Sequence, residues 1–316
     1  MIVLTTMKVK TTIKEQMEER FPTVQFHWKE SIEEAADMLP EADILVTYGE
    51  DLTNEAIEKA KNLKWINVAS AGLDLMPFEK IAEKQINVTN ARGIHATPMA
   101  EYAIAMLLQV ERNAKQLIEN EKNHLWDRSV KMGTISHKTM LIAGTGAIGQ
   151  ELARIAKAFH IKTIGISRTG EEKAYFDACY TNDALHEHLS EADYIVSILP
   201  STNQTENFFS KKEFQLMKEK AIFLNMGRGK TVDEQALIEV LKDNDIKHAV
   251  LDVFQEEPLS KNSALWDLDN CTLTPHLSGI FSTYLDLAFN IFERNLQSYL
   301  NDGSLVENVI DPKRGY

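Results

Sequence analysis

The chain has 316 residues, of which 44% are hydrophobic and 26% are charged, and its formal net charge at neutral pH is −13. This composition excludes an intrinsically disordered chain, and the length predicts two domains, because one hydrophobic core rarely serves so many residues. The acidic balance also argues against nucleic acid as a partner, since phosphate binding needs a basic surface.

The cysteines and the apolar segments bear on where the protein acts. Cys179 and Cys271 lie far apart without the spacing of metal ligands, so we expect no disulfide and no metal site, which suits the cytoplasm. Residues 1–8 are typical of a first strand and not of a signal peptide. The longest apolar run, residues 103–108, is too short to span a bilayer, so we expect no membrane partner.

Short β-rich runs alternate with helical segments up to about residue 95. After the first strand, further strands are expected at residues 24–28, 43–47, 64–68 and 86–89. Charged residues at helical spacing separate them, as in residues 53–61. This alternation predicts a parallel sheet covered by helices on both faces.

A long helix is expected from Pro98 to about Asn120. Proline suits the first turn of a helix, and apolar side chains are dense between Ala103 and Val110. Such a face either packs in a core or forms an interface between two copies of the chain, and both explanations remain open.

The alternation of strands and helices resumes at residue 139. Strands are expected at residues 139–143, 163–166, 194–199, 221–225, 248–253 and 271–274. A last helix, residues 284–300, is expected to return to the first domain. The fold class is therefore predicted to be α/β, with two doubly wound parallel-sheet domains.

A glycine-rich turn joins the strand at 139–143 to a helix expected at 150–159. It reads Gly144, Thr145, Gly146, Ala147, Ile148 and Gly149, the G-x-G-x-x-G pattern of dinucleotide-binding turns. The first glycine allows the tight turn, the second lets a pyrophosphate approach the backbone, and the third lets helix and strand pack closely. The helix N-terminus then offers N–H groups to the phosphate. A P-loop at residues 229–231 is excluded, because Leu224 stands where that motif needs a glycine.

The end of the second strand of this domain indicates which dinucleotide binds. NAD-binding enzymes place a carboxylate there to accept the ribose hydroxyls, whereas this chain has Ser167, Arg168 and Thr169. These side chains can donate hydrogen bonds to a 2′-phosphate, and the arginine can pair with it. We therefore expect NADP as the preferred cofactor, with NAD as the alternative.

Three further segments each follow an expected strand, at residues 225–229, 252–259 and 274–279. The carboxyl ends of parallel strands are the edge where open α/β sheets bind ligands. With the turn at 144–149, these N-x-G-R-G, D-V-x-x-x-E-P-L and T-P-H segments resemble the D-isomer-specific 2-hydroxyacid dehydrogenases in order and spacing, over nearly the whole chain. Residues 90–93 with 99–101 look like that family's crossing between domains, and residues 69–74 like its substrate-carboxylate loop.

The resemblance implies a flavodoxin-like substrate domain at residues 1–97 and 284–316, and a Rossmann dinucleotide-binding domain at residues 98–283. It implies an oxidoreductase that transfers a hydride between NADP(H) or NAD(H) and a small D-2-hydroxy or 2-oxo acid. It also implies a homodimer built on the helix expected from Pro98 to Asn120. Because no regulatory domain is expected beyond residue 316, the long phosphoglycerate dehydrogenases are a weaker match.

The chemistry of the reaction suggests a role for each candidate residue. His276 is expected to be the acid–base, because the carbonyl oxygen collects a proton when the hydride arrives. Glu257 is expected to orient its ring, and Arg228 to grip the substrate carboxylate and polarise the carbonyl. The backbone N–H groups of Ser70, Ala71 and Gly72 are expected to hold the other edge of that carboxylate. Leu199, Pro200, Met226, Gly227, Arg228, Asp252, His276 and Gly279 are also expected at the cofactor.

Other functions remain open alongside this one. A cofactor-sensing binding protein, like the transcriptional corepressors that share this fold, could also retain Arg228, Glu257 and His276. Formate oxidation is less favoured, because that group pairs its histidine with an amide where Glu257 stands here. Glyoxylate or hydroxypyruvate is the expected substrate, since residues 167–169 resemble the NADP-preferring reductases of those acids. His95 receives no role.

Overall fold

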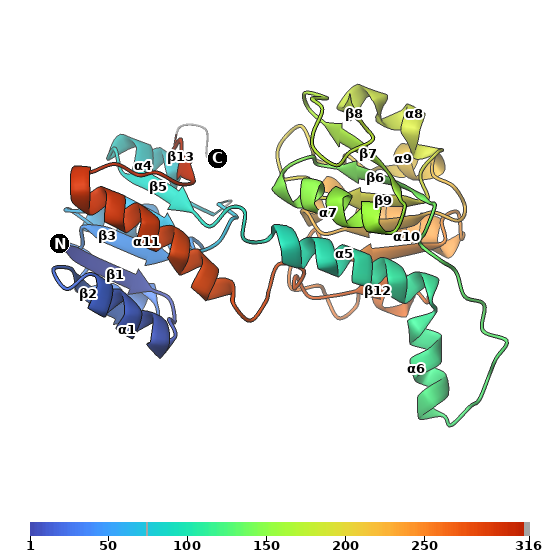
Figure 1. The fold of residues 1–316 in the computed structure, drawn as a ribbon, viewed down its shortest axis with the longest axis horizontal. Coiled ribbons are helices and arrows are strands. Elements are labelled where there is room, and N and C mark those ends of the chain that lie inside the picture. Colours follow the sequence, from blue (N-terminus) through green and yellow to red (C-terminus); the bar gives the residue numbers. More distant parts are fainter. Residues whose placement is uncertain (74, 313–316) are drawn as a thin grey trace. The chain divides into compact units, whose positions relative to one another are not determined.

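The computed structural model describes residues 1–73 and 75–312, which divide into two compact units (Figure 1). Unit 1 comprises Met1–Ile94 and Phe281–Tyr316, and unit 2 comprises His95–Ile280. The boundaries expected from the sequence lie after residues 97 and 283. Among the described residues, no helix is both long and apolar enough to cross a membrane.

Unit 1 is built around a six-stranded sheet with the order β13-β5-β4-β3-β1-β2. Its first five strands are parallel, and their order is that of flavodoxin-like sheets. The elements are β1 (Ile2–Thr6), α1 (Thr11–Arg20), β2 (Gln25–Lys29), α2 (Ile32–Ala35), β3 (Ile44–Thr47), α3 (Asn54–Lys59), β4 (Trp65–Val68), α4 (Phe78–Glu83), β5 (Asn87–Asn90), α11 (Tyr284–Asp302) and β13 (Val309–Ile310).

Apolar side chains pack in two clusters in unit 1. Every residue of β3 and β4 is buried, because helices cover these central strands. One cluster includes Leu45 and Ile66, and the other includes Trp65. Helix α11 completes the second cluster, with the ring of Phe292 at 5.2 Å from that of Trp65.

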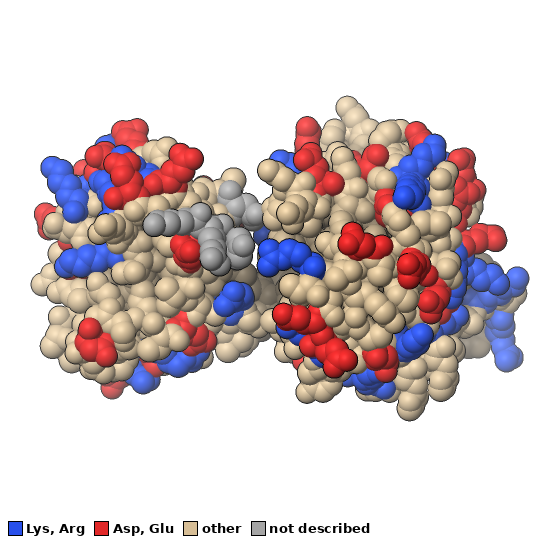
Figure 2. Space-filling view, turned by 90° about the horizontal axis from the view of Figure 1, so that it is seen from above, with Lys and Arg blue, Asp and Glu red and all other residues tan. Residues whose placement is uncertain are grey.

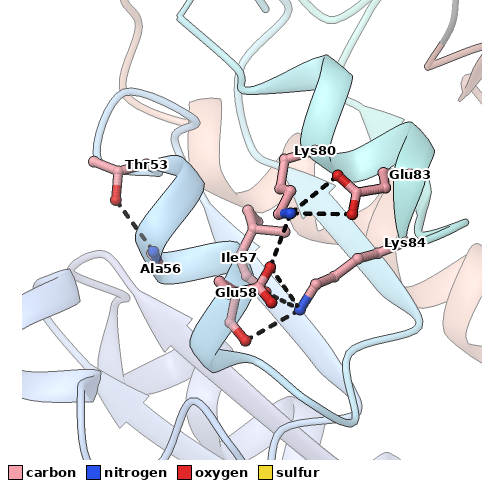
Figure 3. A network of polar contacts seen from close by, with 7 residues as sticks. All are labelled: Thr53, Ala56, Ile57, Glu58, Lys80, Glu83 and Lys84. Atoms are coloured by element: carbon pink, nitrogen blue, oxygen red, sulfur yellow. Dashed lines mark hydrogen bonds and ion pairs between the residues drawn. The ribbon is translucent and has the colours of Figure 1, made fainter.

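A polar network ties α3 to α4 at the surface of unit 1 (Figure 3). The Lys84 amine donates to the carbonyl oxygens of Ile57 and Glu58, 3.1 Å from each, and so satisfies acceptors that the end of α3 leaves open. The Lys80 amine pairs with the Glu58 carboxylate at 3.0 Å. The helices that follow β3 and β4 are therefore held together.

Unit 2 is built around a seven-stranded parallel sheet with the order β12-β11-β10-β9-β6-β7-β8. Counted from β6, this is the Rossmann order extended by one strand. The elements are α5 (Ala96–Glu111), α6 (Ala114–Lys122), β6 (Thr139–Ala143), α7 (Ala147–Ala158), β7 (Lys162–Ser167), β8 (Ala178–Thr181), α8 (Leu185–Leu189), β9 (Tyr194–Ser197), α9 (Lys211–Gln215), β10 (Ile222–Asn225), α10 (Glu234–Lys242), β11 (His248–Leu251) and β12 (Cys271–Leu273), with short 3-10 turns at Asn182–Ala184, Gly229–Thr231 and Ala264–Asp267.

The predicted pair of doubly wound α/β sheets is confirmed, but several elements differ from the prediction. The single helix expected from Pro98 to Asn120 is wrong: α5 ends at Glu111, and α6 starts after Asn113, whose φ of 48° is left-handed and breaks the helix. Strands β8 and β13 were not predicted, and β13 runs antiparallel to β5. Helix α7 starts at Ala147, three residues before the predicted start.

The apolar face of α5 belongs to the core of unit 2. Ala103, Ile104 and Leu107 are buried against residues of β6 and α7, so their density reflects packing within the unit. The exposed apolar side chains lie further along, on α6 and the segment after it, where Trp126 is 90% exposed. Figure 1 shows α6 projecting away from the sheet of unit 2. Acidic and basic side chains are interspersed over the face drawn in Figure 2.

Candidate active site

Three polar segments of unit 2 lie at one edge of its sheet. Arg228 follows β10, Asp252 follows β11, and His276 follows β12. These strands are parallel neighbours, so their carboxyl ends meet at the same edge. This edge is the ligand-binding edge of open α/β sheets.

His276 and Glu257 form a hydrogen-bonded pair at this edge. The Nδ1 atom of His276 lies 2.8 Å from Oε2 of Glu257, and the two side chains are 51% and 35% exposed. The other carboxylate oxygen of Glu257 accepts a hydrogen bond from the Phe254 N–H at 3.0 Å. The carboxylate is thereby fixed, and it holds the imidazole with Nε2 left to face solvent or a ligand.

Asp252 is fully buried and orders the loop that carries His276. Its Oδ1 accepts the Thr274 hydroxyl at 2.5 Å and the Leu277 N–H at 2.8 Å, and its Oδ2 accepts the Ser278 N–H at 2.9 Å. The Asp252 carbonyl also accepts the N–H of His276 at 2.9 Å. A buried carboxylate needs such donors, and together they fix the backbone on both sides of His276.

Two residues that the sequence reasoning did not select lie beside this loop. The Tyr102 hydroxyl on α5 contacts the Thr274 hydroxyl at 2.6 Å, which extends the Asp252 network to that helix. His95, directly before α5, is packed against Gly279, because a Cβ on that glycine would lie 3.0 Å from its ring. Burial, and then the Arg228 guanidinium, lower the pKa of His95 below its ordinary value.

The segment that carries Arg228 is held by close packing and by hydrogen bonds. The Arg228 carbonyl accepts the Thr231 hydroxyl at 2.7 Å and the Asn225 amide at 3.2 Å. At Gly229, a Cβ would lie 1.9 Å from the backbone carbonyl of Phe254, so only glycine fits there. The arginine is therefore displayed from a rigid turn between β10 and the loop after β11.

The turn after β6 has the properties that a dinucleotide requires. Gly144 has a φ of 110°, which side chains rarely adopt. A Cβ on Gly149 would lie 2.1 Å from the Gly144 carbonyl oxygen, whereas one on Gly146 would meet nothing within 4 Å. Helix α7 starts at Ala147, so its first N–H groups adjoin this open space. The turn thus fits a pyrophosphate at Gly146, with Thr145 buried behind it and Ile148 in the first turn of the helix.

The remaining residues expected at the cofactor surround this edge. Strand β7 ends at Ser167, and Arg168 and Thr169 after it are exposed. The Ser167 hydroxyl accepts the Gly170 N–H at 3.2 Å, so its own hydrogen can be donated elsewhere. Beyond β9 and β10, Leu199 and Met226 are buried, Pro200 is exposed, and a Cβ on Gly227 would lie 2.6 Å from the Leu199 carbonyl oxygen.

In unit 1, the loop after β4 carries Ser70, Ala71 and Gly72. The Ser70 hydroxyl donates to the carbonyls of Tyr48 and Gly72, at 3.1 and 3.0 Å, and the Asn90 amide donates to that of Ala71 at 2.9 Å. Within residues 1–73 and 75–312, the N–H groups of Ser70, Ala71 and Gly72 donate no hydrogen bond. Successive N–H groups of this kind can hold an anion. Asp74, at the end of the predicted loop, lies outside the described residues.

The chain is similar to several known proteins. Residues 104–278 match the family model described as D-isomer specific 2-hydroxyacid dehydrogenase, NAD binding domain. The chain is 31% identical over 309 residues to glyoxylate/hydroxypyruvate reductase B of Klebsiella pneumoniae subsp. pneumoniae, covering 95% of this chain and 94% of that protein.

Two further matches extend over most of the chain. It is 35% identical over 282 residues to D-3-phosphoglycerate dehydrogenase of Methanocaldococcus jannaschii, covering 88% of this chain and 53% of that protein, so it spans about half the length of that relative. A crystal structure of a D-isomer specific 2-hydroxyacid dehydrogenase family protein from Aeromonas salmonicida matches with a TM-score of 0.90 and 33% identity, covering 98% of this chain and 99% of that one.

Proposed function

The chain belongs to the D-isomer specific 2-hydroxyacid dehydrogenases, which are NAD(P)-dependent oxidoreductases, and within that family we propose that it is an NADP(H)-preferring reductase of a small 2-oxo acid, glyoxylate or hydroxypyruvate. The product is the corresponding hydroxy acid, of D configuration where the carbon is chiral. The hydrogen-bonded pair of His276 and Glu257 carries the proposal, because it supplies the proton that reduction requires.

The proton is held at Nε2 of His276. Its Nδ1 atom is engaged by Glu257 at 2.8 Å, which orients the ring and leaves Nε2 to donate. As the carbonyl oxygen becomes an alkoxide, Nε2 delivers its proton to that oxygen, and in the reverse direction it accepts the hydroxyl proton. Glu257 has the role of positioning the ring and does not itself transfer a proton to the substrate.

Two groups are proposed to bind the substrate carboxylate. The Arg228 guanidinium offers paired donors of the geometry that a carboxylate accepts, and its charge polarises the adjacent carbonyl. The N–H groups of Ser70, Ala71 and Gly72 offer a second, uncharged cradle. Binding the carboxylate at two points would hold the acid in one orientation, which lowers the entropic cost of hydride transfer.

The cofactor is proposed to lie along the edge formed by β6, β7 and β9 to β12. NADP(H) supplies or accepts the hydride when it is bound. Residues 144–149 hold its pyrophosphate, and Asp252 and Gly279 belong to the segments around its nicotinamide. Ser167, Arg168 and Thr169 bind the 2′-phosphate, and the exposure of Arg168 together with the free hydrogen of the Ser167 hydroxyl supports this preference.

We also infer a homodimer formed through α6 and the segment that follows it. Ile118, Leu125 and Trp126 are 50%, 56% and 90% exposed there, which is unusual for large apolar side chains that lie together in sequence. The core packing of α5 explains why the interface would lie on α6 instead. A cytoplasmic location is consistent with the two free thiols, Cys179 and Cys271.

One assay tests the proposed function. Absorbance of NADPH and of NADH is followed with a panel of 2-oxo acids that includes glyoxylate, hydroxypyruvate and pyruvate. We expect the highest kcat/KM with NADPH and one of the first two acids. Binding of NADPH without turnover of any acid would instead identify a cofactor-sensing protein, and equal or better use of NADH would overturn the cofactor preference.

A further inference from the structure

Two neighbouring loops of unit 1 meet at the carboxyl edge of its sheet. The loop after β3 carries Tyr48, Gly49 and Glu50, and the loop after β4 carries Ser70. The strands are parallel neighbours, and the Ser70 hydroxyl donates to the Tyr48 carbonyl at 3.1 Å. Gly49 has a φ of 86°, and a Cβ there would lie 3.0 Å from Val68 at the end of β4. The first loop is thus fixed against the second, with the exposed Glu50 one residue beyond the contact.

Aromatic side chains lie beside the loop after β4. The Tyr284 hydroxyl, at the start of α11, donates to the carbonyl of Ala69 at 2.8 Å. Its ring meets the ring of Phe281 edge to face, with 5.6 Å between centroids. Burial raises the pKa of Tyr284, and the Tyr48 phenol and the Glu50 carboxylate raise it further. The Glu50 charge therefore reaches the residue that anchors the loop of Ser70, Ala71 and Gly72.

We propose that Glu50, together with Tyr48 and Tyr284, forms a subsite for the substrate side chain that admits 2-oxo acids without a second negative charge and rejects those with a second carboxylate or a phosphate. The inference rests on the proposed function, in which the N–H groups of residues 70–72 hold the carboxylate of the acid. A substrate held there has its side chain at the same edge of the sheet as Glu50, where a second anion meets a like charge.

No positive charge on the loop itself offsets Glu50. Residues 48–53 contain no lysine or arginine, and Asp51 adds a second carboxylate, anchored by the Thr47 hydroxyl at 2.5 Å. Lys10 lies on the loop after β1, but its amine is held by Asp286 at 2.8 Å and by the carbonyl of Ser282 at 2.9 Å. Its charge is therefore already paired with that of Asp286.

The proposal distinguishes the two kinds of curated relative that the chain resembles. One is named for a phosphorylated acid and the other for acids without phosphate. A phosphate carries about −1.5 to −2 charges at neutral pH. At roughly 8 Å from a carboxylate, with an effective dielectric constant of about 20 to 40, each unit of charge lowers binding about five- to thirtyfold. The subsite should therefore favour hydroxypyruvate over its 3-phosphate.

The test compares these two acids in the purified full chain. The ratio of kcat/KM for hydroxypyruvate to that for 3-phosphohydroxypyruvate is measured with NADPH for the wild type, Glu50→Gln, Glu50→Lys and Glu41→Gln. Glu41 is a matched control, because it is exposed and lies before β3, at the opposite edge of the sheet. We expect the ratio to fall by about tenfold or more in Glu50→Gln, to fall further in Glu50→Lys, and to change less than about twofold in Glu41→Gln.

Salt provides an independent readout. Raising the ionic strength should narrow the discrimination of the wild type, because screening weakens the repulsion, and should leave that of Glu50→Gln nearly unchanged. The inference is overturned if the wild type uses the phosphorylated acid as well as hydroxypyruvate, or if Glu50→Gln leaves the ratio as it was.

Failure of the proposed function would look different. If no 2-oxo acid is turned over, calorimetry on the NADP⁺-loaded protein compares the binding of D-glycerate with that of 3-phospho-D-glycerate. Weaker binding of the phosphorylated acid that is relieved in Glu50→Gln upholds the charge filter without catalysis. Equal binding of both acids, or binding of neither, overturns it.

Discussion

Replacing Glu257 by glutamine tests the proton-transfer pair with the smallest change of shape. The carboxylate uses both of its oxygens, one with Nδ1 of His276 at 2.8 Å and the other with the N–H of Phe254 at 3.0 Å. Glutamine keeps only one oxygen, so it cannot accept from both donors. Either the imidazole loses its partner or the loop after β11 loses its anchor, and in both cases the negative charge is gone.

The size of the effect follows from the environment of the pair. A hydrogen bond to a charged group contributes about 1.5–3 kcal/mol. Because the His276 side chain is 51% exposed and Glu257 is 35% exposed, solvent reduces this to about 1–2 kcal/mol. We therefore expect kcat for 2-oxo acid reduction to fall about five- to thirtyfold. The affinity for NADPH should change little, since the pyrophosphate is proposed to lie at residues 144–149.

The measurement is steady-state reduction with saturating NADPH, combined with a fluorescence titration of NADPH binding. Glu256→Gln serves as the control, because Glu256 is exposed and its replacement removes the same charge from the neighbouring position. A Glu257→Gln enzyme with normal kcat would refute the assignment of this carboxylate. A loss of NADPH affinity equal to the loss of kcat would show that the residue supports the cofactor and not the histidine.

Four further outcomes are expected. His276→Ala should lower kcat about 10²- to 10⁴-fold, with NADPH binding retained in a titration; normal turnover would exclude it as the acid–base. Arg168→Ala should raise the KM for NADPH about tenfold or more and that for NADH much less, since a charged hydrogen bond is lost; parallel changes would count against a 2′-phosphate contact. Ile118→Glu should convert a dimer to a monomer in light scattering at micromolar concentration, and a monomeric wild type would refute the interface. Burial lowers the pKa of His248 to about 4, so between pH 6.5 and 4 only the unfolded chain takes up this proton. As the pH falls through that window, the free energy of unfolding measured in urea should fall by about 3 kcal/mol more for the wild type than for His248→Gln. An identical pH dependence of the two proteins would show that the ring is protonated in the folded state.

The central strands of each sheet were predicted from the sequence, whereas the outermost strands β8 and β13 were missed. Strands such as β6 and β9 are short runs of buried apolar residues, which leave a clear pattern. Strand β8 is an edge strand of mixed polarity, and β13 has two residues, so neither produces a readable alternation. The break before α6 was missed because its cause is the left-handed backbone of Asn113, within a segment whose composition still favours helix.

In the candidate site, residues of short sequence motifs could be predicted, whereas contacts made only in the folded chain could not. The residues of the glycine turn could be chosen from the sequence, because their roles depend on neighbours within six positions. Tyr102 could not, since it contacts Thr274, 172 residues away in the chain. The surroundings of His95 were also hidden, because only the folded chain brings it to Arg228 and Gly279. Asp252 was selected as a cofactor contact, but its hydrogen bonds to the loop around His276 could not be foreseen from spacing.

Unit 1 is formed by two separate stretches of the chain, which affects when its core can be completed during synthesis. Unit 2 is one continuous stretch of chain, so the ribosome delivers every strand of its sheet in a single run. The first part of unit 1 precedes unit 2 in the chain, yet the Trp65 cluster lacks Phe289, Phe292 and Leu296 until α11 emerges after the whole of unit 2. Until then the nascent chain exposes an apolar face, which is the kind of surface that chaperones cover and that aggregates when they do not. Unit 1 is therefore begun before unit 2 and completed after it.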